Sequence, residues 1–366
     1  MKTKMKLTKF LMGAFIGSIL LSACSDDDDF NREIDEPLGN YDNGILVLNE
    51  GGTGTITYIS EDLQTNEQAI YQAVNNGDDI GAYAQSIFFD GDLAYIISNG
   101  SNLITVVNRY TFELIGKVDS DLEVPRYGII YNGKAYVTNQ GDVNDGGVDD
   151  FLTIINLETL EVEQTIPIGT QGEALEFIEE KDGKLYIQKA SYDTGNKIAV
   201  FNPTTNTVDN TIVTYTYTGT LYGEPKEFGL NSFEIEDGFI YTLSGSYLEK
   251  FNLNTLELES SIPLAYEDGD AYNLDIEDDQ IYFTVGNSVY TMSMNAEEAP
   301  EEALLTYTTN SAYGVMYGFE VEDDRIYVAD GGDFMSDSFV EVYDLQGNLL
   351  ENITVGVGPN GFYFND

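Results

Sequence analysis

The chain is dominated by short runs in which apolar and polar residues alternate, the pattern of half-buried β-strands. Pairs of runs meet at Asp-Gly, Asn-Gly or Asp-Asp, and the second run of each pair contains a tyrosine. Two turn residues of this kind between alternating runs predict a tight β-hairpin. Six such hairpins follow one another, at residues 87–97, 129–137, 181–187, 236–241, 277–282 and 322–327.

Each hairpin is followed by a second pair of predicted strands. The turn of this second pair has the form Asn-x-x-Thr, as at residues 107–113, 155–161 and 251–257. Four antiparallel strands that recur about every 40–50 residues are typical of the blades of a β-propeller. We therefore predict an all-β protein built from such blades.

A seventh blade is divided between the two ends of the sequence. Residues 43–51 match residues 133–141 in pattern and are predicted to form a second strand. The missing first strand is found at residues 361–366, so the C-terminal strand would complete the first blade. Closure of the ring removes exposed sheet edges that favour aggregation. We predict a seven-bladed propeller of four-stranded antiparallel blades over residues 43–366, with eight blades as the alternative.

The N-terminus has the order of features that marks a secreted lipoprotein. Four lysines lie within the first nine residues, an apolar stretch covers residues 10–21, and Leu21-Ser22-Ala23-Cys24 follows. The apolar stretch is too short to span a membrane, so residues 1–23 are predicted to be a signal peptide. Cys24 is the only cysteine, lacks a disulfide partner in the chain, and is predicted to carry the lipid. The alternative is an incidental cysteine in an ordinary cleaved signal.

An acidic run, Ser25-Asp26-Asp27-Asp28-Asp29, comes directly after the predicted lipid attachment site. A run of like charges usually forms a solvated tether, and we assign residues 24–42 to one. The run also resembles the signal that exports Bacteroidota lipoproteins to the outer face of the outer membrane. This resemblance implies a lipid-anchored protein that faces the cell exterior, with a periplasm-facing anchor as the alternative.

Composition excludes several classes of function. The net charge is −48 at pH 7, and so acidic a surface repels nucleic acid. The chain contains no histidine, which excludes imidazole metal ligands, histidine-based triads and histidine general bases. It is rich in aromatic residues, with 26 tyrosines and 19 phenylalanines.

Four segments, at residues 47–51, 84–87, 125–127 and 134–139, carry a family resemblance. They resemble the YncE-like seven-bladed propeller lipoproteins of Bacteroidota. The matching segments look structural, so the resemblance implies the fold and the cellular address more directly than the ligand. Members of that group include the BtuG-type surface proteins, which capture cobalamin and pass it to a TonB-dependent transporter.

Candidate binding residues follow from the topology. The first strand of each propeller blade lines the central channel, so the residues that open these strands meet at the mouth of the channel. Aligning the blades on their hairpin turns gives Gln85, Tyr127, Ser232, Asn273 and Asn360, with Arg126, Glu176, Asn231, Tyr272 and Tyr317 beside them in sequence. A ring of amide, hydroxyl and aromatic side chains suits a large, mostly neutral ligand that forms hydrogen bonds. Two alternatives stay open: the ring is polar because water fills the channel, and Arg126 forms a structural salt bridge to a neighbouring blade.

The same face is predicted to carry the longest loops and the most aromatic connections. The loops are at residues 139–150, 189–193 and 330–338, and the tyrosine-rich connections are at residues 215–225 and 311–317. Tyrosine and methionine side chains adapt to flat faces and irregular apolar edges, so these segments indicate a recognition surface.

One of these loops also suggests a calcium site. Asp142, Asn144 and Asp145 precede Gly146, as in a cation-binding loop. The spacing is one residue short of an EF-hand and no bidentate glutamate follows at the proper place, so a solvated acidic loop is the preferred interpretation.

The leading hypothesis is a non-enzymatic surface protein that binds cobalamin or a related corrinoid and delivers it to a TonB-dependent outer-membrane transporter. No cofactor is expected, and calcium is the only one left open. The second hypothesis is a glycan-binding lipoprotein of a polysaccharide-uptake system, since tyrosine stacks on sugars as well as on corrins. The third is an enzyme of the lactonase or lyase type, in which Glu173, Glu176 and Arg126 are the conceivable catalytic groups. A structural or adhesive role is the remaining alternative.

Overall fold

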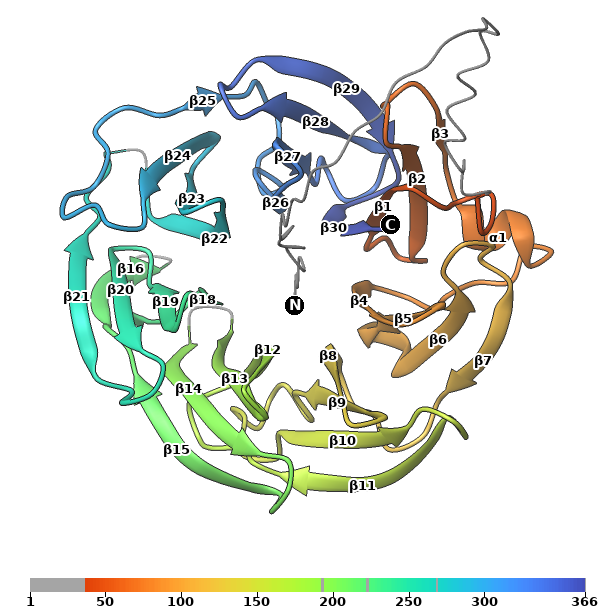
Figure 1. The fold of residues 1–366 in the computed structure, drawn as a ribbon, viewed down its shortest axis with the longest axis horizontal. Coiled ribbons are helices and arrows are strands. Elements are labelled where there is room, and N and C mark those ends of the chain that lie inside the picture. Colours follow the sequence, from red (N-terminus) through yellow and green to blue (C-terminus); the bar gives the residue numbers. More distant parts are fainter. Residues whose placement is uncertain (1–36, 192–193, 222–223, 268, 366) are drawn as a thin grey trace, which may run out of the picture. The chain divides into compact units, whose positions relative to one another are not determined.

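Seven four-stranded sheets form a ring in the computed structural model of the chain (Figure 1). The structure describes residues 37–191, 194–221, 224–267 and 269–365, and Leu38–Asp366 is one compact unit. The predicted signal peptide, Cys24 and most of the predicted tether lie outside the described residues. None of the helices within the described ranges has the length and hydropathy needed to span a bilayer.

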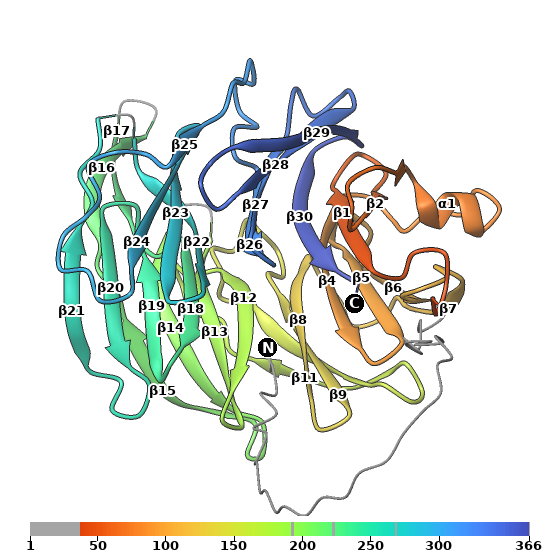
Figure 2. The same cartoon turned by 45° about the horizontal axis from the view of Figure 1, so that its top comes forward.

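Each blade is an antiparallel sheet whose first strand lies innermost (Figure 1, Figure 2). Blade 1 consists of β30 (Pro359–Phe364), β1 (Gly44–Asn49), β2 (Thr55–Ser60) and β3 (Asn66–Glu67), and blade 2 of β4 (Ala84–Asp90), β5 (Leu93–Ser98), β6 (Leu103–Asn108) and β7 (Leu114–Val118). Blade 3 consists of β8 (Pro125–Tyr131), β9 (Lys134–Asn139), β10 (Phe151–Asn156) and β11 (Glu161–Pro167). Blade 4 consists of β12 (Leu175–Lys181), β13 (Lys184–Ser191), β14 (Thr194–Asn202) and β15 (Thr207–Val213). Blade 5 consists of β18 (Ser232–Glu236), β19 (Phe239–Leu243), β20 (Tyr247–Asn252) and β21 (Leu258–Pro263). Blade 6 consists of β22 (Ala271–Glu277), β23 (Gln280–Val285), β24 (Ser288–Ser293) and β25 (Leu305–Thr306). Blade 7 consists of β26 (Gly318–Glu322), β27 (Arg325–Asp330), β28 (Ser338–Asp344) and β29 (Leu349–Val355). Outside the blades are α1 (Ile70–Val74), the short 3-10 turn η1 (Asn99–Ser101) and a hairpin of β16 (Tyr217–Leu221) and β17 (Glu224–Phe228). The predicted all-β, seven-bladed architecture is confirmed.

A tyrosine in the second strand of six blades packs that blade against the next. These side chains are all buried: Tyr95, Tyr136, Tyr186, Tyr241, Tyr282 and Tyr327. Each belongs to a hydrophobic cluster with strands of the following blade; Tyr241, for example, packs with Ile281 and Phe283. In blade 1 Leu46 takes this position and packs with Ile96 of blade 2. The tyrosine that recurs in the sequence is therefore the core residue of the inter-blade contacts.

The C-terminal strand closes the ring, as the sequence predicted. β30 pairs with β1, with Ile45 opposite Phe364 and Val47 opposite Phe362. Buried Asn365 then fastens this seam: its backbone oxygen accepts a hydrogen bond from Asn43 N at 2.8 Å, and its Nδ2 donates to Arg109 O at 2.8 Å. Because Arg109 belongs to blade 2, Asn365 ties the seam of blade 1 to the neighbouring blade.

The ring has two distinct faces. The loop face carries the starts of the innermost strands and the loops between second and third strands, such as residues 140–150 and 331–337. The hairpin face carries the tight turns between first and second strands. Residues 38–42, which the sequence assigned to the tether, pack on the hairpin face: Tyr41 is buried, and its backbone nitrogen donates to Tyr110 O at 3.0 Å.

The tight turns of blades 3 to 7 have the type I′ geometry expected for hairpins, with positive φ at both turn residues. Glycine holds the second turn position in blades 3 to 5, as at Gly238. Aspartate stands there in blades 6 and 7, Asp279 at φ 65° and Asp324 at φ 60°. A side chain with a Cβ is strained in this region, although aspartate tolerates it better than most.

Replacing Asp279 by glycine should therefore stabilise the propeller. We expect the free energy of unfolding to rise by about 0.5 kcal/mol, because relief of strain exceeds the extra chain entropy that glycine loses on folding. Gly238→Asp is the matched control, since a Cβ there would meet no atom within 4 Å and only its φ of 82° opposes the change. The free energy of unfolding of Gly238→Asp, measured by urea unfolding, should fall by a similar amount. Equal stability of the three proteins would contradict the strain argument.

Candidate functional site

β-Bulges place most of the predicted site residues at the mouth of the channel. In blade 3, Pro125 pairs with Asn139 and Gly128 with Val137, so two residues oppose one on the neighbouring strand. A similar register shift occurs at the start of the innermost strand in blades 1, 2, 4 and 6. A bulge bends the strand and re-aims the side chains beside it. The predicted site residues within these bulges are Gln85, Arg126, Tyr127, Glu176, Asn273 and Asn360.

Backbone carbonyls at the start of the innermost strands, two of them within bulges, accept hydrogen bonds from side chains of the preceding blade. These contacts form what we call the mouth ring, because they link successive blades around the channel. Its side-chain-to-carbonyl bonds are Asn360 Nδ2 to Ala84 O (2.9 Å), Ser86 Oγ to Arg126 O (2.6 Å), Thr138 Oγ1 to Glu176 O (2.8 Å), Gln188 Nε2 to Asn231 O (3.3 Å), Asn231 Nδ2 to Ala271 O (2.8 Å) and Asn273 Nδ2 to Met316 O (3.1 Å). Between blades 7 and 1 the hydroxyl of Tyr317 donates to the carboxylate of Glu50. Three of the predicted binding residues therefore direct amide donors into the fold.

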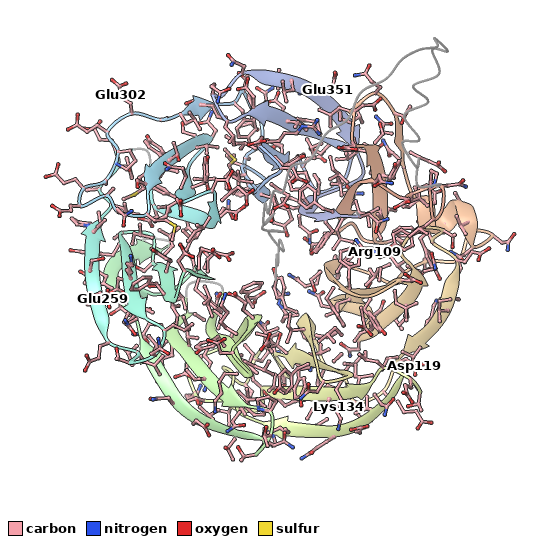
Figure 3. All side chains as sticks on the ribbon, viewed as in Figure 1. Arg109, Asp119, Lys134, Glu259, Glu302 and Glu351 are labelled. Carbon is pink, nitrogen blue, oxygen red and sulfur yellow. The ribbon has the colours of Figure 1, made fainter. Side chains whose placement is uncertain are left out.

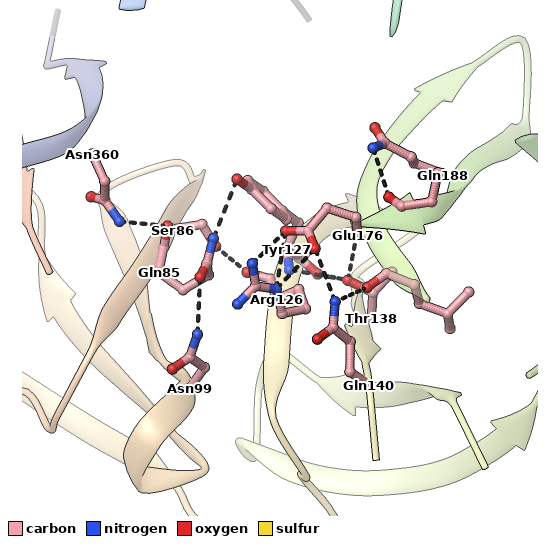
Figure 4. A network of polar contacts seen from close by, with 12 residues as sticks. Gln85, Ser86, Asn99, Arg126, Tyr127, Thr138, Gln140, Glu176, Gln188 and Asn360 are labelled. Atoms are coloured by element: carbon pink, nitrogen blue, oxygen red, sulfur yellow. Dashed lines mark hydrogen bonds and ion pairs between the residues drawn. The ribbon is translucent and has the colours of Figure 1, made fainter. Parts of the chain in front are cut away.

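On the side of blades 2 to 4, the predicted residues form polar contacts with one another (Figure 4). Arg126, only 6% exposed, donates through Nε and Nη2 to Glu176 Oε1 at 3.0 and 2.7 Å. Gln140 Nε2 donates to Glu176 Oε2 at 2.9 Å, and Gln85 Nε2 donates to Tyr127 Oη at 3.3 Å. Arg126 thus makes the salt bridge to a neighbouring blade that was the alternative to a ligand-binding role.

A cleft of about 470 Å³ lies between blades 6 and 7 on the loop face. Its walls include three of the predicted residues, Tyr272, Asn273 and Tyr317, and the two tyrosines are 42% and 37% exposed. Asn273 Nδ2 joins the walls, because it donates to Thr284 Oγ1 at 3.0 Å as well as to Met316 O. A cavity of this size is typical of small-molecule sites. The structure therefore gathers these three predicted residues around one cavity. Ser232 lies outside it and bonds instead to Leu274 N at 3.2 Å.

A buried carboxylate supports the blade 7 wall of the cleft. Asp330, at the end of β27, is 1% exposed. Its side-chain oxygens accept hydrogen bonds from the hydroxyls of Tyr307, Thr309 and Ser311 and from the backbone nitrogen of Gly332. The Tyr307 hydroxyl in turn accepts a bond from Met316 N at 3.0 Å. Asp330 therefore fixes the connection that ends in Tyr317 against the loop at residues 331–337.

Large apolar side chains are exposed on the loops beside the cleft. Tyr313 is 90% exposed and Met335 is 85% exposed, both in segments that the sequence marked for recognition. Phe334 packs edge-on against Tyr317, with ring centroids 4.8 Å apart. Tyr83, just before blade 2, is also exposed. Its backbone nitrogen donates to Gly51 O of blade 1 at 3.2 Å, which places it beside these aromatic side chains. Exposed aromatic side chains thus extend from the connections of blade 7 to the start of blade 2.

Cations are unevenly distributed around this face. Acidic side chains project from the outer rim, among them Asp119, Glu259, Glu302 and Glu351 (Figure 3). Arg126, Lys189 and Lys197 lie on the loop side of blades 3 and 4 and are paired with carboxylates. From residue 251 to 366 the sequence contains one cation, Arg325, which lies next to the hairpin turn of blade 7.

Glu173, a candidate for acid–base chemistry, is held by two lysines. Its carboxylate lies 2.7 Å from Lys189 Nζ and 2.5 Å from Lys197 Nζ. Burial raises the pKa of Glu173, but the lysines outweigh burial, and the pKa lies below its ordinary value. A carboxylate that stays ionised has no proton to donate, so Glu173 is not suited to act as a general acid.

The acidic loop at residues 140–150 closes on itself. Asp142 Oδ1 accepts bonds from Asn144 N and Nδ2, both at 2.9 Å, and Asp142 N donates to Asp149 Oδ2 at 3.0 Å. Across the part of the chain that the structure describes, no group of three or more His, Cys, Asp or Glu side chains could hold a metal ion. Asp142 and Asn144 thus bond to each other within the loop, and Asp145 N donates to Asp142 O at 2.8 Å.

Comparison with known proteins assigns the chain to a family. A family model described as a domain of unknown function, DUF5074, matches residues 43–365. The chain belongs to this family. The DUF5074 match spans all seven blades. No curated protein matches the sequence.

Solved structures share the fold of this DUF5074 protein at low sequence identity. A quinonprotein alcohol dehydrogenase-like protein from Bacteroides thetaiotaomicron aligns with a TM-score of 0.63 and 16% identity over 90% of this chain and 80% of that chain. A functionally unknown protein from Desulfotomaculum acetoxidans aligns with a TM-score of 0.61 and 10% identity over 88% and 98% of the two chains. BamB from Moraxella catarrhalis aligns with a TM-score of 0.51 and 14% identity over 87% of each chain. At these identities the likeness is one of fold alone.

Several residues of the DUF5074 site escaped the sequence prediction. Ser86, Thr138 and Gln188 complete the mouth ring, Gln140 braces Glu176, and Asp330 supports the cleft. The only sequence signal near these residues was the Asn-x-Gly pattern that repeats at residues 49–51 and 139–141. The two asparagines tie second to third strands: Asn49 Nδ2 donates to Thr57 Oγ1 and Asn139 Nδ2 to Thr153 Oγ1, both at 3.1 Å.

Asp150, which is 1% exposed, should make stability depend on pH. Burial and the nearby Asp149 and Asp145 raise its pKa to about 6 from 3.8, although a bond from Leu175 N opposes the rise. The folded protein thus binds the proton of Asp150 more tightly than the unfolded chain does. The contribution of this group to the free energy of unfolding is fully present below pH 3.8 and is lost as the pH rises through 6.

Asp150→Asn should therefore gain stability relative to the unsubstituted protein as the pH rises from 4 to 8. The difference should approach about 3 kcal/mol at most, given about 1.4 kcal/mol for each pKa unit. Urea unfolding at several pH values measures it. Parallel stability curves for the two proteins would contradict the prediction.

Proposed function

We propose that this protein is a surface lipoprotein whose loop face binds cobalamin or a related corrinoid and passes it to a TonB-dependent outer-membrane transporter. The observation that carries the proposal is the cleft between blades 6 and 7, bordered by exposed aromatic side chains. Tyr272 and Tyr317 offer flat contact area, while Asn273 and Thr284 bring polar atoms between them. Such a surface suits a large ligand with an extended ring and many hydrogen-bonding substituents.

Two further observations support the address and the ligand class. Cys24 and the acidic run that follows have the pattern of an exported lipoprotein, and several segments resemble the YncE-like group that includes BtuG-type proteins. The chain has no histidine, so it has no imidazole with which to replace a ligand of cobalt. Binding would depend on aromatic packing and on hydrogen bonds to the periphery of the corrinoid.

Tyr317→Ala should weaken cobalamin binding at least tenfold in calorimetric titration. This corresponds to about 1.4 kcal/mol, a typical loss for an aromatic side chain at the centre of an interface. Tyr317→Phe should retain most of the affinity, because it keeps the ring and removes the hydroxyl that donates to Glu50. Leu258→Ala is the control, an exposed apolar residue on outer strand β21.

The same titration decides between ligand classes. Absence of cobalamin binding at micromolar concentrations would overturn the corrinoid proposal. If affinity electrophoresis then detected binding to a polysaccharide, lost in Tyr317→Ala, the loop face would be a glycan site. Stacking of sugars on the same tyrosines would explain that result.

Lipid attachment has a separate test. Cells that express the protein and are fed labelled palmitate should label it, and Cys24→Ala should abolish the label and release the protein from the membrane fraction. Digestion of intact cells with a protease should remove the unsubstituted protein if it faces the exterior. Retention of label in the Cys24→Ala variant would contradict attachment at this residue.

A further inference from the structure

A chain of hydrogen bonds, which we call the relay, runs from the exposed loop after β27 to the cleft between blades 6 and 7. Gly332 N donates to Asp330 Oδ1 at 2.8 Å, and the Tyr307 hydroxyl donates to Asp330 Oδ2 at 2.9 Å. The Tyr307 oxygen accepts a bond from Met316 N at 3.0 Å, and Met316 O accepts one from Asn273 Nδ2 at 3.1 Å. Because Met316 and Asn273 both line the cleft, the relay joins the loop to the walls of the cavity.

The middle of the relay is buried, whereas the loop at its end is not. Asp330 is 1% exposed, Tyr307 is 2% exposed and Met316 is 5% exposed. Hydrogen bonds in such surroundings are strong, because water does not compete for them. Met335 of the loop, by contrast, is 85% exposed. The relay therefore connects a surface segment to the cleft through a firmly bonded interior.

Met316 is the residue of the relay that can change its conformation. Its φ is 49°, in the left-handed region, which a residue with a Cβ adopts only at a cost in energy. Residues strained in this way persist where their surroundings hold them. Here the backbone nitrogen is held by Tyr307 and the backbone oxygen by Asn273. Loss of the bond to Tyr307 would allow Met316 to return to an ordinary φ, and this would move Tyr317, the next residue of the cleft wall.

We infer that Tyr307 and Asp330 are positioning residues of the cleft, and that the loop at residues 331–337 acts on the cleft through them. The inference rests on the proposed role of the loop face in binding, and it adds a means of release to that role. A transporter that docks on the exposed loop displaces Gly332, which weakens the hold of Asp330 on Tyr307 and lets the cleft wall relax. The ligand is then bound less tightly while the transporter is docked.

The test uses the amide NMR signals of the purified protein labelled with ¹⁵N-methionine. Met335 reports the loop and Met316 reports the cleft, and substitution of each by leucine assigns its signal. Gly332→Ala displaces the loop, because an added Cβ would lie 3.0 Å from Ser338 Oγ and the φ of Gly332 is 63°. We expect this substitution to shift both signals.

A second contact joins the loop to the connection that contains Met316, since Gly331 N donates to Gly314 O at 2.7 Å. Cutting the relay at Tyr307 separates the two routes. Tyr307→Phe removes the hydroxyl and keeps the aromatic ring in the core. In this background the shift of the Met316 signal caused by Gly332→Ala should fall to about a third or less, as expected for coupled sites in a double-mutant cycle.

Gly172→Ala is the matched control. Gly172 lies in the connection between blades 3 and 4 on the loop face, and its φ of 81° makes the substitution similarly strained. It should leave the Met316 signal unchanged. An equal Met316 shift with and without the Tyr307 hydroxyl, no Met316 shift in Gly332→Ala, or a comparable shift in Gly172→Ala would overturn the inference.

Titration with cobalamin separates this inference from the proposed function. Gly332→Ala should weaken binding by about fivefold in the unsubstituted protein, the low end of typical couplings between sites, and by less than about twofold in Tyr307→Phe. If cobalamin does not bind, the corrinoid proposal fails, and the Met316 signal still decides whether the relay acts on the cleft. If cobalamin binds but Gly332→Ala weakens it equally in both backgrounds, the relay fails and the proposed function stands.

Discussion

The pairing of the C-terminal strand β30 with β1 is the constraint on which the rest of this propeller depends. Without β30, blade 1 would have no innermost strand and β1 would present an open edge. Tyr327 of blade 7 would also lose Phe362, since their rings lie 5.4 Å apart at the seam. The contacts of Asn365 with Arg109 extend this constraint to blade 2. The ring can thus close only when β1 and β30 are both in place.

The same backbone irregularities serve the fold and the candidate site. The bulges of blades 3 and 4 expose carbonyls that the preceding blade binds, and the bulges of blades 3 and 6 turn Tyr127 and Asn273 away from regular alternation. Asn273 shows the connection most clearly, because it joins blade 6 to Met316 and forms part of the cleft wall. A substitution there would alter blade packing and ligand contacts together. Tyr272 and Tyr317 differ from it, since their rings are partly exposed at the cleft.

Features that repeat could be read from the sequence, and features that depend on single contacts could not. Alternating residues, hairpin turns and the recurrent tyrosine predicted the blades, because the same physical demand acts seven times. The position of Tyr272, Asn273 and Tyr317 at the mouth followed from topology. Their cleft did not, because it depends on how Asp330 draws two loops together. Nor did the sequence reveal that Tyr41 is buried, since one aromatic residue after an acidic run has no periodicity.

The docking of residues 38–42 on the hairpin face has a mechanical consequence. The chain reaches β1 from that face, and β1 then runs towards the loop face between β2 and β30. A pull on the chain ahead of Leu38 therefore acts along the axis of β1. It loads the hydrogen bonds to both neighbouring strands at once, in shear, rather than peeling them apart singly. The pairing of β1 with β2 and β30 thus resists such a pull in shear, the direction in which paired strands are stronger. The cleft lies on the opposite face and is not loaded by the pull.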